Sequence, residues 1–251
     1  MRQISAPGLA RGPPGERGRS RPCTRHGHFA YVVSVLPSCP AALPSLWRPT
    51  PSRLLRLLAG LAIFGAGEGC LVASELGNSP WTVLAEGVSL NVPLGIGSAT
   101  VAISFAVLLL WIPLRQRPGL GTVANAIVIG LAIDATLALL PGNLGLGVRG
   151  GLMVGGIALV ALGSGLYLTA ALGPGPRDGL MTGLSRRTGA SLRLVRVSIE
   201  VSVLVAGVLL GGTAGVGTLA FALAIGPGVQ FAVGRVETPQ WRALMDRRAA
   251  D

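Results

Sequence analysis

Leu76-Gly-Asn-Ser-Pro80 and Leu172-Gly-Pro-Gly-Pro176 are two copies of one short pattern, the second starting at residue 172 and thus 96 residues after the first. The same offset aligns Gly119-Leu-Gly-Thr122 with Gly215-Val-Gly-Thr218. About twenty of about seventy aligned positions are identical, whereas this composition gives about seven by chance. Matching Pro, Ser and Thr positions are harder to obtain by chance than matching Gly and Leu. The pattern therefore predicts an internal repeat.

Six apolar stretches follow Arg53, three in each copy of the repeat. Each has about 17–21 residues, which at about 1.5 Å per residue crosses a hydrocarbon core of about 30 Å. Half of the chain is hydrophobic and 12% is charged, against about a quarter charged in a soluble domain. The sequence therefore predicts six transmembrane helices. Their expected ranges are 54–73, 96–114, 121–140, 151–171, 194–210 and 214–233.

Arginine supplies every positive side chain, because the sequence contains no lysine. Segments rich in Arg alternate with segments that hold one Arg or none. With a cytoplasmic N-terminus, 74–95, 141–150 (with Arg149 alone) and 211–213 lie outside, and all six spans obey the positive-inside rule. Both termini are then cytoplasmic. The arginines expected inside are Arg48, Arg53, Arg56, Arg115, Arg117, Arg177, Arg186, Arg187, Arg193, Arg235, Arg242, Arg247 and Arg248.

Three spans per copy is an odd number, so the second copy must enter the bilayer upside down relative to the first. The predicted fold class is an all-α membrane protein with six transmembrane helices, arranged as two inverted three-helix repeats. Secondary transporters commonly use this plan. Residues 1–50 are expected to form a disordered Arg-, Pro- and Gly-rich tail. The repeats are placed at 51–140 and 141–235, with a cytoplasmic tail at 236–251.

A short helix is expected between the first and second span of each copy, at 79–91 and 175–188. Pro80 and Pro176 suit the first position of a helix. About 12 residues cannot span a bilayer, so each helix either lies at the interface or re-enters the membrane. A re-entrant half-helix would point its positive N-terminus at an anion or a polar group.

Two glycine pairs in the spans, Gly65-x-x-x-Gly69 and Gly151-x-x-x-Gly155, permit close approach of neighbouring helices. Gly145-x-Gly147-x-x-Gly150 matches a dinucleotide-binding fingerprint, but it lies between two spans with no strand before it, so we read the match as accidental.

The residues around the short helices also resemble a known family. Leu76-Gly-Asn-Ser-Pro-Trp-Thr-Val-Leu, followed by Gly87-Val-Ser, resembles the bacterial YczE/YitT-type membrane proteins, as does Gly173-Pro-Gly-Pro-Arg-Asp-Gly-Leu-Met with Leu184-Ser-Arg-Arg. The resemblance covers about residues 54–235. It implies a multi-pass protein of the bacterial inner membrane with a poorly defined activity, and it supplies no catalytic residues.

Ionisable residues within a bilayer are costly and are functional by default. Glu68, Asp134 and Glu200 lie in the first, third and fifth predicted spans. Arg196 precedes Glu200 by four residues, which predicts an ion pair on one helix face. Glu68 and Asp134 have no obvious partner, so they form either a proton or cation site or a polar seam between helices. Arg177 and Asp178 are expected to pair with each other or to cap the second short helix.

Catalysis and metal binding find little support in the sequence. The predicted spans contain no histidine, which removes most general-base and metal chemistry. Cys23, His26 and His28 are too few to build a structural zinc site. We therefore expect no enzyme activity and no cofactor. We also expect no nucleic-acid partner, because the arginines lie in the tail and at the ends of apolar stretches.

Our leading hypothesis is a gradient-driven permease for an unknown small solute or ion, with its site between the two repeats. The alternative is a non-transporting membrane protein that assists or regulates a partner. Either form would sit in the lipid bilayer, and a membrane-protein partner or a homo-oligomer fits both. The residues predicted to line the pathway are Glu68, Asp134, Glu200, Ser79, Pro80, Arg177 and Asp178.

Overall fold

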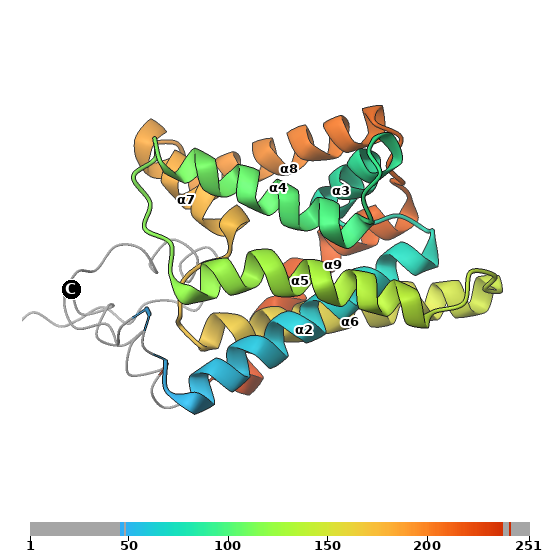
Figure 1. The fold of residues 1–251 in the computed structure, drawn as a ribbon, viewed down its shortest axis with the longest axis horizontal. Coiled ribbons are helices and arrows are strands. Elements are labelled where there is room, and N and C mark those ends of the chain that lie inside the picture. Colours follow the sequence, from blue (N-terminus) through green and yellow to red (C-terminus); the bar gives the residue numbers. More distant parts are fainter. Residues whose placement is uncertain (1–45, 48, 238–240, 242–251) are drawn as a thin grey trace, which may run out of the picture.

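The computed structural model describes residues 46–47, 49–237 and 241, and within them it contains eight helices and no strand (Figure 1). The prediction of an all-α fold is therefore confirmed for the described residues. Nearly all of the predicted tails, 1–50 and 236–251, lie outside them. The helices are α2 (Pro51–Ser74), α3 (Pro80–Asn91), α4 (Ile96–Trp111), α5 (Leu120–Leu139), α6 (Leu146–Thr169), α7 (Pro176–Thr188), α8 (Leu192–Leu209) and α9 (Val216–Val236).

The second four helices follow the first four at the spacing of the sequence repeat. Helices α7, α8 and α9 begin at residues 176, 192 and 216, which is 96 residues after α3, α4 and α5 begin at 80, 96 and 120. Helix α6 begins at 146, 95 residues after α2 begins at 51. Each helix of the first half therefore has a counterpart of the same order and similar length in the second half.

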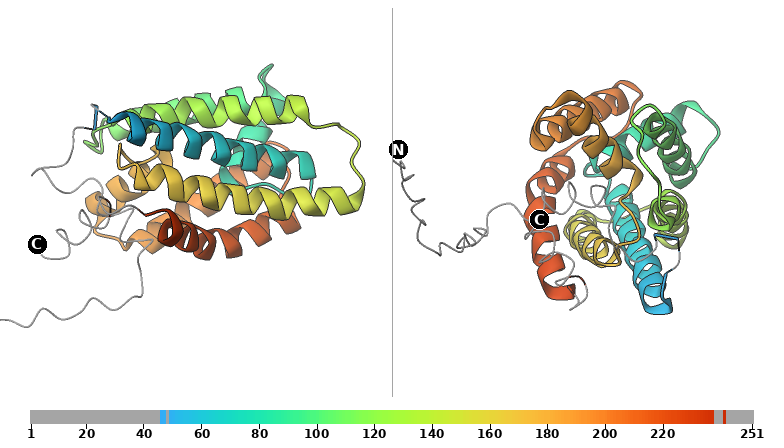
Figure 2. Two further views of the ribbon diagram at one scale, coloured as in Figure 1. Left: turned by 90° about the horizontal axis from the view of Figure 1, so that it is seen from below. Right: turned by 90° about the vertical axis from the view of Figure 1, so that its left-hand side faces the viewer.

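The eight helices form two layers (Figures 1 and 2). One layer has α2 and α6 side by side at its centre, with α5 packed on α2 and α9 packed on α6. The other layer contains the short helices and their long neighbours, where α3 packs on α8 and α4 packs on α7. Helix α4 also packs on α5 and joins the two layers.

Glycines let the two central helices approach closely. A Cβ atom added to Gly67 would lie 2.7 Å from the carbonyl oxygen of Gly156, and one added to Gly156 would lie 2.8 Å from that of Gly67. Gly60 and Gly163 meet in the same way, at 3.0 and 2.6 Å. Because Gly60 and Gly67 are the repeat equivalents of Gly156 and Gly163, the two contacts join the same pair of equivalent positions with the helices exchanged.

The glycine pairs singled out in the sequence behave differently from each other. Gly65 and Gly69 face α5, where added Cβ atoms would lie 2.6 Å from Ala132 and 2.7 Å from Thr136. Gly151 and Gly155 have no described atom within 4 Å of such a position. The first pair thus brings helices together, and the second pair faces outward.

An arginine near the start of each central helix binds backbone carbonyls at the end of the other. Arg53 donates to the carbonyl oxygens of Ala170 and Ala171, just after α6, at 2.9 and 2.7 Å. Its repeat equivalent, Arg149, donates to the carbonyl oxygen of Ser74 at the end of α2, at 2.6 Å. A positive side chain stabilises the free carbonyls and the negative end of a helix. This contact explains the single arginine in the predicted external segment 141–150.

The connections of the two halves also exchange equivalent hydrogen bonds. The Gly121 N–H donates to the carbonyl oxygen of Leu172 at 2.9 Å, and the Gly217 N–H donates to that of Leu76 at 2.8 Å. Reciprocal pairs of this kind are what a two-fold axis between like units produces. The connections of the two halves therefore contact each other at equivalent positions.

The described chain contains four helices long and apolar enough to cross a membrane, α2, α5, α6 and α9. Helices α3 and α4 form a pair bent by 112°, and counting that pair as one span raises the number to five. The predicted spans at 96–114 and 194–210 fall on α4, which has 16 residues, and on α8, which carries Arg193, Arg196 and Glu200. Helix α4 is therefore shorter, and α8 more highly charged, than the four helices that meet the requirements for crossing a membrane.

Candidate functional site

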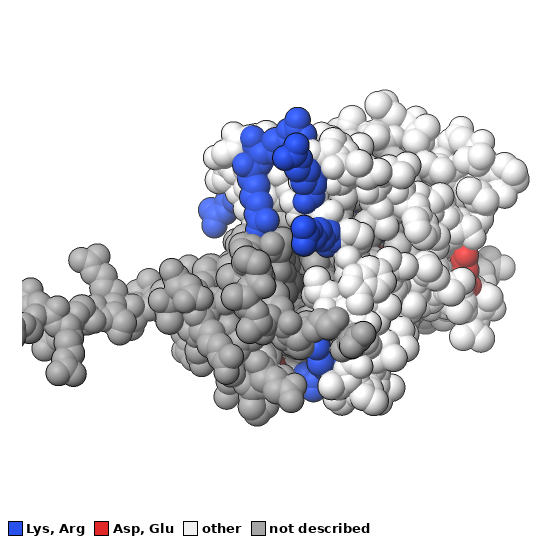
Figure 3. Space-filling model, turned by 60° about the vertical axis from the view of Figure 1, so that its left-hand side comes forward, with Lys and Arg blue, Asp and Glu red and all other residues white. Residues whose placement is uncertain are grey.

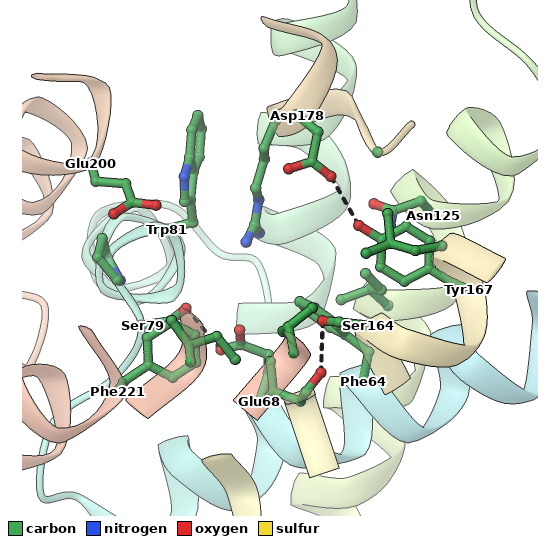
Figure 4. Close-up of a pocket in the computed structure, with 18 of the residues that line it drawn as sticks. Phe64, Glu68, Ser79, Trp81, Asn125, Ser164, Tyr167, Asp178, Glu200 and Phe221 are labelled. Carbon is green, nitrogen blue, oxygen red and sulfur yellow. Dashed lines mark hydrogen bonds between the residues drawn. The ribbon is translucent and has the colours of Figure 1, made fainter. Parts of the chain in front are cut away.

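A cavity of about 100 Å³ is lined by side chains of α2, α3, α5, α6, α7, α8 and α9 (Figure 4). Its wall contains repeat-equivalent residues from both halves. The pairs are Phe64 and Val160, Glu68 and Ser164, Ser79 and Gly175, Trp81 and Arg177, Asn125 and Phe221, and Ile129 and Ile225. The cavity is therefore built by the repeat, but its two sides are chemically different, since an acid faces a serine and a tryptophan faces an arginine.

Glu68 of α2 is the most buried charged residue of this site, with 1% of its surface exposed. Its Oε2 atom accepts hydrogen bonds from Ser79 Oγ at 2.9 Å and from Thr82 Oγ1 at 2.7 Å. Its Oε1 atom is also buried and has no partner among the described residues. A buried acceptor without a donor is costly, and it marks a place for a proton, a water or a ligand.

Arg177, the second residue of α7, lies in the same cavity wall as Glu68. Its guanidinium carbon lies 5.1 Å from the centre of the Trp81 ring, within the range of a cation–π contact. Arg177 interacts electrostatically with Glu68, but among the described residues it makes no ion pair or hydrogen bond. The Trp81 Nε1 donor is buried and has no described partner either. The guanidinium is thus oriented by an aromatic ring while its N–H groups stay available.

The other charged groups of the cavity are already engaged. Tyr167 donates its hydroxyl to Asp178 Oδ2 at 2.9 Å, as Figure 4 shows. Arg196 and Glu200 form the predicted pair along α8, with Nε and Oε1 2.9 Å apart. Arg177 and Asp178, which we expected to pair or to cap the helix, interact electrostatically with each other, and Asp178 lies in the first turn of α7. Glu68 and Arg177 are therefore the charges of the cavity that are left with the weakest partners.

Both short helices begin at the cavity. Helix α3 starts beside Glu68, which lies six residues before Ser74 ends α2, about 9 Å along the helix axis. The Ser79 side chain does not cap α3, and Gly175 has no side chain with which to cap α7. The positive ends of the two short helices therefore meet at one small cavity.

Six of the seven residues predicted to line a pathway do line this cavity, namely Glu68, Ser79, Pro80, Arg177, Asp178 and Glu200. Asp134 does not. Its Oδ1 accepts the Gly97 N–H at 2.8 Å and its Oδ2 accepts the Ser98 hydroxyl at 3.3 Å. A carboxylate in this place stabilises the start of α4. The structure therefore separates Glu68 from Asp134, and we leave Asp134 out of the site.

Sequence reasoning missed several residues of the wall, including Trp81, Asn125, Ser164, Tyr167 and Arg196 as a lining group. Asn125 and Tyr167 carried a usable signal, because each is a polar side chain inside an apolar stretch. Ser164 was identifiable as the repeat equivalent of Glu68. Among the described residues, no cluster of His, Cys, Asp or Glu side chains could hold a metal ion. Cys23, His26 and His28 lie outside those residues.

The sequence also matches the model of a family of unknown function, DUF6198, over residues 51–233. The chain belongs to this family. The match spans every described helix from α2 to α9 except the last residues of α9, so the cavity lies wholly inside the family region. This finding confirms the predicted resemblance to YczE-type membrane proteins.

Two relatives cover most of the same region. An uncharacterized protein of Haemophilus influenzae is 45% identical over 199 residues, which cover 79% of this chain and 91% of the relative. The uncharacterized membrane protein YczE of Bacillus subtilis is 31% identical over 181 residues, covering 70% and 82%. No solved structure matches the chain. The relatives and the apolar helices together identify a membrane protein.

Proposed function

We propose that this protein is a permease for a small solute, with the solute site in the cavity between two inverted halves and with no catalytic step. The observation that carries the proposal is the cavity itself. It is lined by equivalent residues of both halves, and it contains the Oε1 atom of Glu68, which has no partner among the described residues. Transporters built from inverted repeats bind their solutes at this position, beside broken helices.

The proposed topology has six crossings, in which α4 and α8 complete the four longer spans. Contacts between helix ends support it. The end of α2 contacts the start of α6, and the end of α6 contacts the start of α2. The α3 and α7 helices lie at opposite ends of the bundle (Figure 1). In this topology the short helices enter the bilayer from opposite faces.

Charge supports an orientation with both termini in the cytoplasm of a bacterium and the protein in its inner membrane. Exposed arginines gather at one end of the molecule, over the end of α4, the end of α7 and the start of α8 (Figure 3). Arg187 contacts the carbonyl oxygen of Pro113 at 2.9 Å and ties these segments together. Such an end is cytoplasmic by the positive-inside rule. The exposed residues are Arg115, Arg117, Arg186, Arg187 and Arg193.

The two halves also differ in a way that suits alternating access. Helix α4 packs on α5, where Gly97 and Gly130 bring the backbones into contact. No comparable packing joins their counterparts α8 and α9, and Gly226, the equivalent of Gly130, has no described atom within 4 Å of an added Cβ. The α4–α5 contact is therefore close, whereas the equivalent α8–α9 contact is loose. Exchanging these two arrangements would move the opening from one face to the other.

Labelling of a single cysteine in the cavity tests the permease. Ser164→Cys is a small change in a full-length chain whose Cys23, Cys39 and Cys70 are replaced by Ala. We expect membrane-impermeant thiol reagents to reach it from both faces, in right-side-out and in inside-out vesicles, because a permease opens its site alternately. Labelling from one face only, or from neither, would contradict the proposal. It would favour the non-transporting protein that assists a partner.

A further inference from the structure

We propose that the solute is a small monovalent oxyanion, of the size of formate, acetate or nitrate, which binds Arg177 while one proton binds Glu68. This inference rests on the proposed function, because it names the substrate class of the same site. The volume sets the size. A cavity of about 100 Å³ holds about three water molecules at roughly 30 Å³ each, which suits a solute of a few non-hydrogen atoms.

The unpartnered donors of the cavity select an anion. Arg177 has five N–H donors and no described hydrogen-bond acceptor, and the buried Trp81 Nε1 donor lacks one too. The positive ends of α3 and α7 meet at the same space, without side-chain caps. A guanidinium with free N–H groups fits the two oxygens of a planar oxyanion, which can accept two parallel hydrogen bonds. The same anion would satisfy the indole donor.

The second unfilled position of the cavity is the Oε1 atom of Glu68, which we propose as the site of the proton. Glu68 Oε1 is buried and has no described donor, while both hydroxyl donors nearby bind Oε2. A proton on Oε1 removes a charge from a position with 1% exposure, where a carboxylate is costly without a partner. The anion and the proton together therefore complete the unfilled polar groups of the cavity.

Charge balance couples the two ligands. Asp178 accepts the Tyr167 hydroxyl, and Glu200 pairs with Arg196. Arg177 interacts electrostatically with both Glu68 and Asp178, and it is the cation that compensates Glu68. An anion on Arg177 takes up that positive charge, and Glu68 then takes one proton from solution. Helices α5 and α9 add no titratable side chain to the cavity wall. One anion and one proton bind together, and each raises the affinity for the other.

Calorimetry on the purified full-length protein in lipid nanodiscs tests this inference. Sodium formate is titrated at one pH in two buffers that differ in ionisation enthalpy, and the difference in heat gives the protons taken up per anion. We expect about one proton per formate in the wild type. Glu68→Gln should bind formate with proton uptake near zero. Asp134→Asn, an acid of the same bundle outside the cavity, should behave like the wild type.

Two further variants test the anion contacts. Arg177→Gln should weaken formate binding by at least about 30-fold, since it removes one partner of a desolvated charge pair. Trp81→Phe keeps the ring and should weaken binding by about 2- to 10-fold, the effect of one neutral hydrogen bond. Should Arg177→Gln fail to fold, Trp81→Phe and the wild-type titrations still decide the matter.

Several results would overturn the inference. They are no binding of formate, acetate or nitrate by the wild type, binding without proton uptake, uptake that persists in Glu68→Gln, and binding of methylammonium in place of the anions. These failures are distinct from failure of the permease. Labelling of Ser164→Cys from both faces without formate binding would keep the permease and refute the substrate class, whereas formate binding with labelling from one face would do the reverse.

Discussion

Gly156→Leu is expected to destabilise the protein by about 3 kcal/mol or more, an effect at the upper end for overpacking of a core. A Cβ atom at this position already lies 2.8 Å from the Gly67 carbonyl oxygen and 3.2 Å from the Leu71 backbone nitrogen. Neither atom can yield without moving α2. Because α2 and α6 both line the cavity, their separation would also disturb it.

Its neighbour supplies a matched control. Gly155→Leu adds the same side chain to the same helix, but no described atom lies within 4 Å of the added Cβ. We expect this variant to lie within about 0.5 kcal/mol of the wild type, as exposed substitutions usually do. The midpoint of thermal unfolding in detergent measures both variants. Equal stability of the two would show that the close crossing of α2 and α6 does not hold the fold together.

Glu86→Ala should cost about 3 kcal/mol. The Glu86 carboxylate of α3 accepts three hydrogen bonds, from Asn78 Nδ2 at 2.8 Å, from the Thr213 N–H at 2.7 Å and from Thr213 Oγ1 at 2.8 Å. Hydrogen bonds to a charged group contribute about 1.5–3 kcal/mol each, and they are not additive. The alanine variant also leaves the buried Asn78 amide without its acceptor. The connection between α8 and α9 would then come loose from α3.

Glu86→Gln distinguishes the loss of these hydrogen bonds from the loss of the side chain. Glutamine has the same length and keeps one carbonyl oxygen as an acceptor, so we expect about half of the cost of the alanine variant or less. Urea or detergent unfolding of the two variants supplies the comparison. If both variants cost the same, the charge of Glu86 acts through something other than its contacts to Asn78 and Thr213.

The long helices were largely predictable, because a helix that crosses hydrocarbon must be apolar over a fixed length. The expected stretch 121–140 is α5 within one residue at each end, and 214–233 overlaps α9 with its start two residues early. The stretch 96–114 overshoots α4 by three residues, since Pro113 cannot continue a helix. Other ends differ where contacts between the halves hold them, such as the start of α6 beside Arg149, which no local pattern contains.

The candidate site was predictable in its charged residues and less so in its geometry. Charge within an apolar stretch pointed to Glu68 and Glu200, and the repeat pointed to Ser79 and Arg177. The same reasoning selected Asp134, because sequence alone cannot tell an acid that stabilises the start of a neighbouring helix from one that faces a cavity. The stacking of Arg177 on Trp81 was not predictable, because it joins equivalent residues of opposite halves and no local pattern contains it.

The most direct test of the inverted architecture uses one pair of equivalent positions. Val92 follows α3 and Thr188 ends α7; both are exposed, and they are 96 residues apart in the sequence. Val92→Cys and Thr188→Cys are made separately in the chain that lacks Cys23, Cys39 and Cys70, and intact vesicles are labelled with an impermeant thiol reagent. The account predicts labelling of Val92→Cys from the periplasmic face and of Thr188→Cys from the cytoplasmic face. Labelling of both from the same face would contradict the inverted halves.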